Sequence, residues 1–462
     1  MSVPRIVWFR RDLRLADQPA LHAAAQAGPV VPVFVLDKAL AGDRAYGGAS
    51  RWWLHHSLES LDAGLGKLGS RIVLRRGDAC AELAQIARET GACAVHAIRH
   101  YEPWWREAQG ALKKALPAGC ELRLHDGNYL AEPGSVATGS GGGYKIYTPF
   151  AKAVLERMPP RDALPAPEHV AAPTAWPKSD DLADWNLLPA KPDWADGLRA
   201  FWAVGESAGQ ERLEEWANAV AHYAESRNLP SQDGSSRLSP HLHWGEISPV
   251  QVWHRLAGGT GAGAGWQTYA KELIWRDYAQ QIVAQFPDYG TRSFRDGYSG
   301  LWRTGGGADA DFAAWTRGLT GYPIVDAGMR QLWRTGWMHN RVRMIAASFL
   351  VKHLLIDWRR GERWFWDCLV DADYANNGVN WQWITGTGVD SAMFVRIMAP
   401  LTQSAKFGAA GYIREYVPEL SALSDEDIHD PPEELRGSYP PPIIGHREGR
   451  ERALAAFRLA RA

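Results

Sequence analysis

The sequence predicts an α/β N-terminal domain, built on a doubly wound parallel five-stranded sheet, and an all-α C-terminal domain joined to it by a long linker. Two observations support this fold class. Apolar, β-branched runs alternate with Ala- and Leu-rich stretches over residues 1–130, and strand–helix alternation favours a parallel sheet. Helical spacing of apolar residues then dominates residues 201–462. A chain of 462 residues is long enough for each part to bury its own core.

Five segments of the first domain have the composition of buried strands. They are RIVWF (5–9), VVPVFVLD (30–37), RIVLRRG (71–77), ACAVHAI (92–98) and CELRLHD (120–126). No G-x-G-x-x-G motif follows the first of them, so the dinucleotide-binding fingerprint is absent. A ligand at the carboxyl edge of the sheet is still compatible with such a domain.

The composition changes in residues 131–200. Eight prolines fall between Pro159 and Pro192, mixed with Ala, Asp and Lys, which predicts an extended linker. After the linker, Gly or Pro separates stretches with helical spacing, at 211–227, 248–259, 266–287, 326–358 and 361–377. Residues 375–388, ANNGVNWQWITGTG, place Trp381 and Trp383 two apart in a composition typical of a loop.

Charge and cysteine content narrow the class of protein. The net charge is −1, so any surface that binds nucleic acid must be local. The cysteines form no CxxC pair, which is typical of a reducing compartment, and no apolar run is long enough to span a membrane. We therefore expect a soluble, cytoplasmic protein. The absence of G-x-S-x-G, P-loop and HExxH motifs disfavours hydrolase and NTPase chemistry.

Three segments combine residue types that bind ligands. Residues 233–249, DGSSRLSPHLHWGEISP, bring hydroxyls and Arg237 to a helix start, which suits a phosphate, although an ordinary serine cap has the same letters. His241, His243 and Glu246 in this segment are more typical of structural side chains than of a metal site, and we expect no metal. In KELIWRDY, the spacing of Glu272, Trp275 and Arg276 places them on one helical face; an amphipathic helix with an exposed ion pair is the alternative.

The third segment is basic. Residues 331–365 contain seven Lys or Arg and two acids, interleaved with Trp, which indicates a nucleic-acid groove or a solvated helical face. Asn340 and Met344 are spaced one helical turn apart within it. The acids of DADYANN, Asp371 and Asp373, either bind a cation or pair with Arg343.

Five motifs together resemble the photolyase/cryptochrome family. They are WFRRDLRLADQPAL, DGSSRLSPHLHWGEISP, KELIWRDY, TGYPIVDAGMRQLWRTGWMHNRVRM and NNGVNWQW, and the resemblance runs from residue 5 to about residue 455. WMHNRVRM is most similar to the microbial cyclobutane pyrimidine dimer (deoxyribodipyrimidine) photolyases. The resemblance implies FAD as cofactor and a light-driven lyase that splits pyrimidine dimers in DNA.

The resemblance also implies roles for individual residues. Positions that match the family's FAD contacts are Tyr223, Ser235, Ser236, Arg237, Leu238, Ser239, Arg276, Asn340, Arg343, Asp371, Asp373 and Asn377. Among them, Arg343 is expected to pair with Asp373 beside the flavin ring, and Asn377 to face its N5. The pocket for the flipped dimer matches Glu272, Trp275, Asn340, Met344 and Trp383. The relay that photoreduces the flavin matches Trp381, Trp358 and Trp302, the last disturbed in spacing by the GGGADAD segment.

Contacts with DNA and with a second chromophore complete these expectations. Arg227, Arg341 and Arg396 resemble phosphate-contacting positions, in addition to Trp275, Met344 and Trp383 at the lesion, so damaged DNA is bound without sequence specificity. Arg51 and Glu102 are candidates for an antenna site that holds methenyltetrahydrofolate, a deazaflavin, FMN or nothing. We expect a monomer. DSAMFVRIMAP (390–400) departs from the family's commoner aromatic and Pro-containing form.

Two relatives within the family are alternatives. The (6-4) photolyases carry histidines at the positions of Asn340 and Met344, and their chemistry needs a proton donor that neither residue supplies. A cryptochrome-type photoreceptor without repair activity is the second alternative. The complete set of lesion-pocket residues, and the absence of a long tail after the helical domain, favour dimer repair over signalling.

Overall fold

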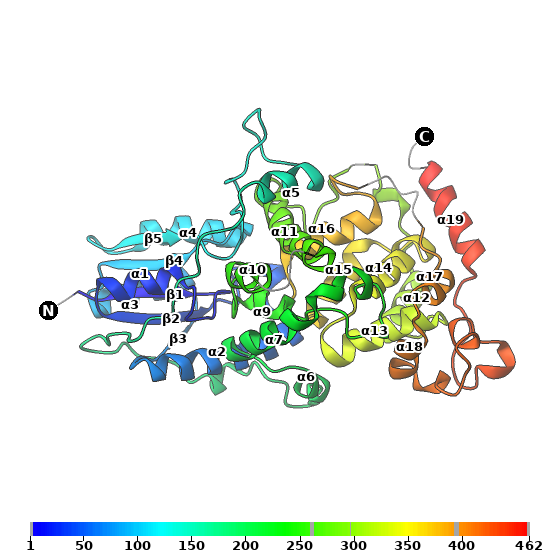
Figure 1. The fold of residues 1–462 in the computed structure, drawn as a ribbon, viewed down its shortest axis with the longest axis horizontal. Helices are drawn as coiled ribbons and strands as arrows, with labels where there is room; N and C mark the ends of the chain where they lie inside the picture. The colour runs from blue at the N-terminus through cyan, green and yellow to red at the C-terminus, as the bar shows by residue number, and fades with distance from the viewer. Residues whose placement is uncertain (1–2, 259–262, 296, 392–396, 460–462) are drawn as a thin grey trace. The chain divides into compact units, whose positions relative to one another are not determined.

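The computed structural model describes residues 3–258, 263–295, 297–391 and 397–459, and these form two compact units (Figure 1). Unit 1 comprises residues 1–195, 202–221 and 236–287, and unit 2 comprises residues 196–201, 222–235 and 288–462. The predicted boundaries at 130 and 200 divide the chain elsewhere and remain predictions. Within the described residues, no helix is long and apolar enough to cross a membrane.

Unit 1 contains the predicted five-stranded parallel sheet. The strands are β1 (Arg5–Phe9), β2 (Val30–Leu36), β3 (Val73–Arg76), β4 (Ala94–Ile98) and β5 (Glu121–His125). Their order is β3-β2-β1-β4-β5. The chain therefore adds β2 and β3 on one side of β1, and then β4 and β5 on its other side. Every residue of β2 is buried, as expected for a strand covered on both faces. The predicted doubly wound sheet is confirmed.

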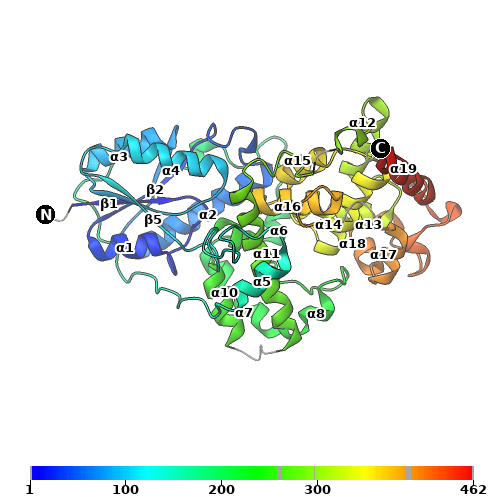
Figure 2. The same cartoon turned by 90° about the horizontal axis from the view of Figure 1, so that it is seen from above.

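Helices follow each of the first four strands. They are α1 (Pro19–Ala27), α2 (Gly48–Lys67), α3 (Ala79–Thr90) and α4 (Pro103–Ala115). Apolar residues of α3 and α4 pack with Trp8 and Val33 in one core cluster, and Figure 2 shows α1 on the opposite face of the sheet. Burial on both faces accounts for the nearly continuous apolar composition of the strands.

The linker is more ordered than the sequence predicts. It contains the helix α5 (Tyr147–Leu155) and a short 3-10 turn at Ala183–Trp185. Unit 1 then continues with α7 (Glu206–Ala219), α9 (Ser239–Trp244), α10 (Pro249–Ala257) and α11 (Ala264–Gln285). Ser248 and Gln251 form a capping box at the start of α10, so a local sequence signal sets that boundary.

Unit 2 is helical. Its helices are α6 (Asp196–Phe201), α8 (Tyr223–Ser226), α12 (Gly306–Arg317), α13 (Pro323–Thr335), α14 (Asn340–Ser348), a π-helical turn (Phe349–His353), α15 (Trp358–Cys368), α16 (Tyr374–Thr385), α17 (Pro400–Lys406), α18 (Ala410–Tyr416) and α19 (His446–Leu459). The stretch 326–358, which has helical spacing throughout, is interrupted at Gly336. This residue ends α13 with a φ of 66°, a left-handed conformation that glycine adopts without strain.

The loop expected at residues 375–388 is a helix over most of its length. Asp373 accepts a hydrogen bond from the backbone N–H of Asn376 and so caps the first turn of α16. Gly386, with a φ of 87°, ends the helix. The prediction from composition was wrong because the buried ring of Trp381 and the cap stabilise a helix that Asn and Gly would not form alone.

Candidate active site

One face of α11 carries three of the predicted side chains. Glu272, Trp275 and Arg276 are all half-buried on this helix, which confirms their placement on one helical face. The guanidinium of Arg276 donates to the backbone carbonyls of Asn128 and, at 3.2 Å, of Leu242. The cation is therefore fixed in direction by two parts of unit 1.

Trp275 is packed against another aromatic ring. The ring of Tyr147 stacks on its indole at a centroid distance of 3.7 Å and an interplanar angle of 3°. The ring of Tyr278 meets the same indole edge-on at 5.3 Å. One face of the predicted lesion-contacting tryptophan is thus covered within unit 1.

The serine-rich segment adopts an unusual backbone before α9. Arg237 has a φ of 53°, in the left-handed region that an arginine occupies only at a cost. Ser236 is buried, and its hydroxyl is 3.0 Å from the hydroxyl of Tyr269. Its carbonyl accepts a hydrogen bond from Arg212. The hydroxyl of Ser236 also accepts the backbone N–H of Leu238 at 3.2 Å, which forms a local turn before α9. The phosphate contact at Ser235–Ser239 stays a prediction.

His241 of the same segment has structural partners. Nδ1 of His241 is 2.6 Å from one carboxylate oxygen of Glu246. The indole N–H of Trp53 donates to the other oxygen at 3.0 Å. All three side chains are buried, so the network satisfies polar groups in the core of unit 1, as the sequence favoured.

In unit 2, α14 carries Asn340, exposed, and Met344, half-buried, one turn apart. The preceding His339 caps the helix by accepting the N–H of Arg341. Arg341 also donates to the side chain of Asn228 at 2.6 Å and approaches the sulfur of Met344 at 3.7 Å. This predicted phosphate contact therefore also positions a predicted lesion contact.

The salt-bridge partner of Arg343 differs from the expected one. Arg343 lies 3.9 Å from a carboxylate oxygen of Asp371 and donates to the carbonyl of Met338. Asp373, the expected partner, caps α16 through the backbone and side chain of Asn376. Asp373 is drawn to the helix start because carboxylates stabilise the unpaired N–H groups there.

Asn377 is buried and held in one orientation. Its side-chain N–H₂ group donates to the carboxylate of Glu362 at 2.8 Å and to the backbone carbonyl of the same residue at 3.1 Å. With both N–H donors directed at Glu362, the remaining polar atom of Asn377 is its amide oxygen, which can only accept.

The two tryptophans of α16 lie in different environments. Trp381 is 3% exposed, meets Phe365 at 5.2 Å and Trp315 at 6.4 Å, and packs over Gly361. Trp383 is half-buried. A separation of two residues rotates side chains by about 200° around a helix, so the two indoles face opposite directions.

The other predicted relay members are also in unit 2. Trp358 is fully buried at the start of α15, and its N–H donates to the hydroxyl of Ser293 at 3.1 Å. Trp302 is half-buried and packs against a small cluster that includes Leu301, Leu355 and Phe457. The GGGADAD segment that disturbs its spacing forms the start of α12.

The basic stretch 331–365 is not one exposed patch. Lys352 is buried and donates to the carbonyl of Thr385, and burial lowers its pKa well below the usual value for lysine. Arg359 pairs with Asp357, and Arg360 with Asp309. The positive charge of this stretch therefore overstates the number of cations available to DNA, because some of these side chains are buried or paired with acids within the fold.

The remaining predicted residues are spread over both units. In unit 2, Tyr223 is buried, and the guanidinium of Arg227 lies over its ring at 5.2 Å. Arg396, with residues 392–395 of the atypical DSAMFVRIMAP segment, lies outside the described residues. In unit 1, Arg51 is exposed, whereas Glu102 is fully buried and paired with Arg11. The antenna site at Arg51 and Glu102 stays a prediction.

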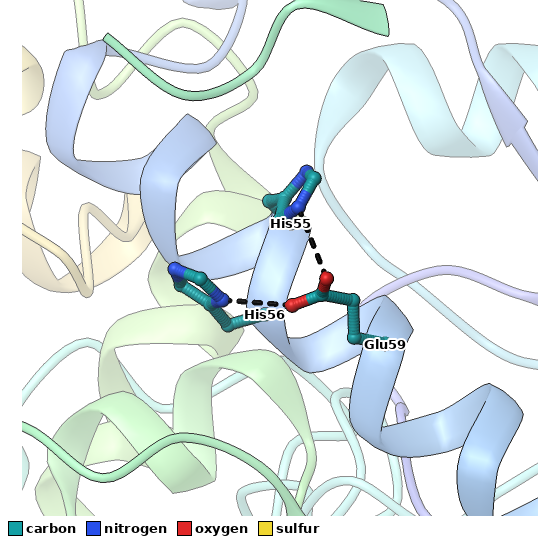
Figure 3. A group of neighbouring side chains, drawn as sticks. All are labelled: His55, His56 and Glu59. Carbon is teal, nitrogen blue, oxygen red and sulfur yellow. Dashed lines mark hydrogen bonds and ion pairs between the residues drawn. The ribbon is translucent and has the colours of Figure 1, made fainter. Parts of the chain in front are cut away.

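A histidine pair on α2 is the group of side chains most suited to a metal in the described part of the chain. His55 and His56 contact different oxygens of Glu59, at 3.3 Å and 2.9 Å (Figure 3). Burial lowers the pKa of His55, which favours its neutral form. Hydrogen bonds to one carboxylate account for this arrangement, and the expected lack of a metal stays a prediction.

Sequence reasoning missed three residues that hold the predicted ones in place: Tyr147, Asn228 and Glu362. Glu362 is 15 residues from Asn377, and Asn228 is 113 residues from Arg341. No local spacing signals such contacts. The predicted linker, residues 131–200, contains six aromatic residues, so aromatic character alone does not single out Tyr147.

Comparison with known families agrees with this geometry. A model described as the FAD binding domain of DNA photolyase matches residues 269–459, and one described as DNA photolyase matches residues 5–168. These matches cover the sheet and most of the helices that carry the predicted side chains. They define a flavin-dependent class of protein.

Individual relatives extend the match over the full chain. The deoxyribodipyrimidine photo-lyase of Agrobacterium fabrum is 46% identical, covering 99% of this chain and 98% of that protein. The crystal structure of a bacterial class III photolyase from Agrobacterium tumefaciens has a TM-score of 0.95 and 45% identity, covering 100% of this chain and 98% of that one. Cryptochrome-1 of Arabidopsis thaliana is 35% identical, covering 98% of this chain and 70% of that protein. The chain belongs to the DNA photolyase family.

Proposed function

We propose that this protein is a light-driven deoxyribodipyrimidine photo-lyase, which uses FAD to split cyclobutane pyrimidine dimers in DNA. The observation that carries the proposal beyond family membership is the orientation of Asn377. Because Glu362 takes both N–H donors of its amide, Asn377 offers an acceptor. An acceptor favours a flavin that bears a proton on N5, as the reduced form does. A photoreceptor that rests with oxidised flavin gains nothing from this arrangement.

The residues present suit the cofactor. The oxygen of Asp371 that lies 3.9 Å from Arg343 is buried and makes no hydrogen bond, so it can accept one from an N–H or hydroxyl of a bound ligand. The strained backbone at Arg237 and the neighbouring serines suit the diphosphate. When bound and reduced, FAD supplies the electron that light makes available.

The lesion must leave the duplex to be repaired. A dimer inside stacked DNA is inaccessible, and a damaged pair is cheaper to unstack than an intact one. The indoles of Trp275 and Trp383 stack on its bases, each stack contributing about 1–3 kcal/mol. Glu272 hydrogen-bonds a pyrimidine of the dimer and stabilises the charge that this pyrimidine carries during bond cleavage. Asn340 and Met344 complete the pocket.

Repair of (6-4) products is disfavoured because His339, which precedes Asn340, is not protonated near pH 7. His339 is buried, and burial lowers its pKa to about 4. Its Nδ1 is engaged as the cap of α14. A buried histidine that is neutral near pH 7 is a poor proton donor for (6-4) chemistry.

The partner is UV-damaged DNA, bound through its backbone without sequence specificity by a monomeric, cytoplasmic enzyme. Arg227 and Arg341 of unit 2, with Arg396, are the proposed phosphate contacts. Binding should weaken steeply as salt is raised, because each phosphate contact releases counterions.

The decisive test is a repair assay with cyclobutane dimers and (6-4) products in parallel, under blue light and in darkness. We expect light-dependent loss of dimers alone, by protein that contains FAD. Repair that is equal in darkness would contradict the proposal, and flavin loading without any repair would favour the photoreceptor. Glu272→Ala should lower the repair yield while FAD stays bound.

A further inference from the structure

Residues 143–147, here called the strap, are tied to α11 within unit 1. The side-chain amides of Gln281 and Gln285 both donate to the carbonyl of Tyr144, at 3.2 Å and 3.0 Å. The hydroxyl of Tyr278 donates to the carbonyl of Lys145 at 2.8 Å. Three side chains of one helix thus hold the backbone of a segment that the composition predicts to be linker.

The strap lies close to α11 at Gly143, where an added side chain would force the end of the Gln285 side chain to move. A Cβ added at Gly143 would lie 2.4 Å from the side-chain carbon of Gln285, closer than van der Waals contact allows. Close approach of the backbone at this position allows the next residues to run along the helix. The strap is therefore a specific contact of α11 and more than a passing loop.

At its end, the strap places the ring of Tyr147 flat on Trp275. The centroids are 3.7 Å apart and the planes are within 3° of parallel. The hydroxyl of Tyr147 donates to the carbonyl of Lys271 at 2.8 Å, one turn earlier on α11. Because Tyr147 is anchored at both ends of its side chain, the indole that it covers is held in one orientation. Its covered face is closed to any ligand.

We propose that Tyr147 is a positioning residue for dimer binding: it holds Trp275 so that only the uncovered face of the indole stacks on the flipped lesion. This role rests on the proposed function, which assigns Trp275 to the lesion. A tryptophan that is already fixed loses no further rotamer freedom when the dimer binds, so the fixed ring binds more tightly than a mobile one.

The test uses the full-length, FAD-loaded protein and an oligonucleotide with one cyclobutane dimer. For Tyr147→Ala, we expect the Kd for this DNA to rise roughly 3- to 10-fold, the effect of one side chain left mobile. The repair rate at saturating DNA should stay within about twofold, because the residue acts on binding and not on cleavage. Tyr147→Phe keeps the stacked ring and loses the hydrogen bond to Lys271, so it should restore most of the affinity.

Two control variants distinguish the positioning role of Tyr147 from a general loosening of the strap. Tyr144→Ala removes another aromatic ring of the strap, one that meets Phe150 at 6.1 Å, and should leave the Kd unchanged. In a chain that already carries Trp275→Ala, the change Tyr147→Ala should have no further effect, because residues that act as a unit are not additive. Melting temperature and FAD content show whether each variant is folded, and Y147L replaces Y147A in the cycle if that variant does not fold.

The outcomes distinguish this role from the proposed function. If the unaltered protein does not prefer dimer-containing DNA, both are overturned. If it does, and Tyr147→Ala binds as tightly as the unaltered protein, the positioning role alone is wrong. The positioning role is also wrong if the effect of Tyr147→Ala persists in the Trp275→Ala background, since the tyrosine would then act through something else.

Discussion

Helices α11 and α16 carry chemistry in two different ways. On α11, Glu272, Trp275 and Arg276 follow helical spacing, share one face and are all half-buried. On α16, Trp381 and Trp383 are two residues apart, and one is enclosed while the other is half-buried. Spacing of three or four residues joins side chains into one surface, whereas spacing of two divides them between opposite faces.

From this difference we expect the α11 residues to act together and the α16 tryptophans to act separately. Substitutions of the three α11 residues should impair the same function, since each residue contributes to one surface. Substitutions of the two α16 tryptophans should impair different functions, because one indole faces the interior of unit 2 and the other does not. The comparison can therefore be tested by substitutions that affect one face at a time.

The largest effect is expected at the enclosed face of α16. Trp381→Phe should nearly abolish reduction of the flavin under blue light, because the proposed relay loses its first member. Absorbance of FAD during illumination with an external reductant measures this. Protein reduced chemically beforehand should still repair dimers. Unchanged photoreduction would remove Trp381 from the relay.

The half-buried face should respond through binding. Trp383→Ala should weaken binding of dimer-containing DNA by about 1–3 kcal/mol, the contribution of one base–aromatic stack. Photoreduction should stay normal, in contrast to Trp381→Phe. Fluorescence anisotropy with labelled DNA measures the affinity. If both substitutions change both properties, the two faces are not independent.

Packing behind Trp381 should affect stability. A Cβ at Gly361 would lie 2.3 Å from the Trp381 ring and 2.5 Å from Leu350, so Gly361→Ala should lower the free energy of unfolding by about 1–2 kcal/mol. Gly110→Ala, in the interior of α4 with open space around it, should instead raise stability by about 0.5–1 kcal/mol. Urea unfolding compares the two. Equal effects would show that the ring yields to the added methyl group.

On the buried side of α11, Asp277 should make the free energy of unfolding depend on pH. Burial raises the pKa of Asp277 to about 8, and this carboxyl accepts the N–H of Ala131. Between its ordinary pKa of 3.8 and about 8, the folded chain holds a proton that the unfolded chain has released. The free energy of unfolding therefore falls as pH rises through this window, by at most about 1.4 kcal/mol per pH unit.

Asp277→Asn should flatten that slope, because the amide keeps an acceptor for Ala131 and does not titrate. Urea unfolding at pH 5, 6, 7 and 8 measures the slope for both proteins. Identical slopes would mean that Asp277 is ionised in the folded state.

The sheet was predictable because its strands are buried on both faces and their composition follows directly. The face of α11 was predictable because helical spacing is a local property. Helix α16 was missed since its stability comes from the Asp373 cap and from burial of Trp381, which depends on chain far away in sequence. The same reason explains the partner of Arg343, where two acids two residues apart offered no local basis for choosing Asp371.

The roles of the tryptophans came from the family resemblance, and the structure supplies their environments. The supports of the site were beyond prediction. Glu362, which orients Asn377, and Tyr147, which covers Trp275, are contacts between segments that sequence spacing does not relate. Three-dimensional packing alone brings such pairs together.

At position 237, the stability of the flavin-free fold and the proposed binding of a phosphate favour different residues. With a φ of 53°, this position would be less strained as glycine, at a gain of about 1–3 kcal/mol to the flavin-free fold. Arginine at this position supplies the charge proposed to meet a phosphate. Selection of the flavin-free chain for heat tolerance would therefore favour glycine at position 237, whereas selection for cofactor retention would keep arginine.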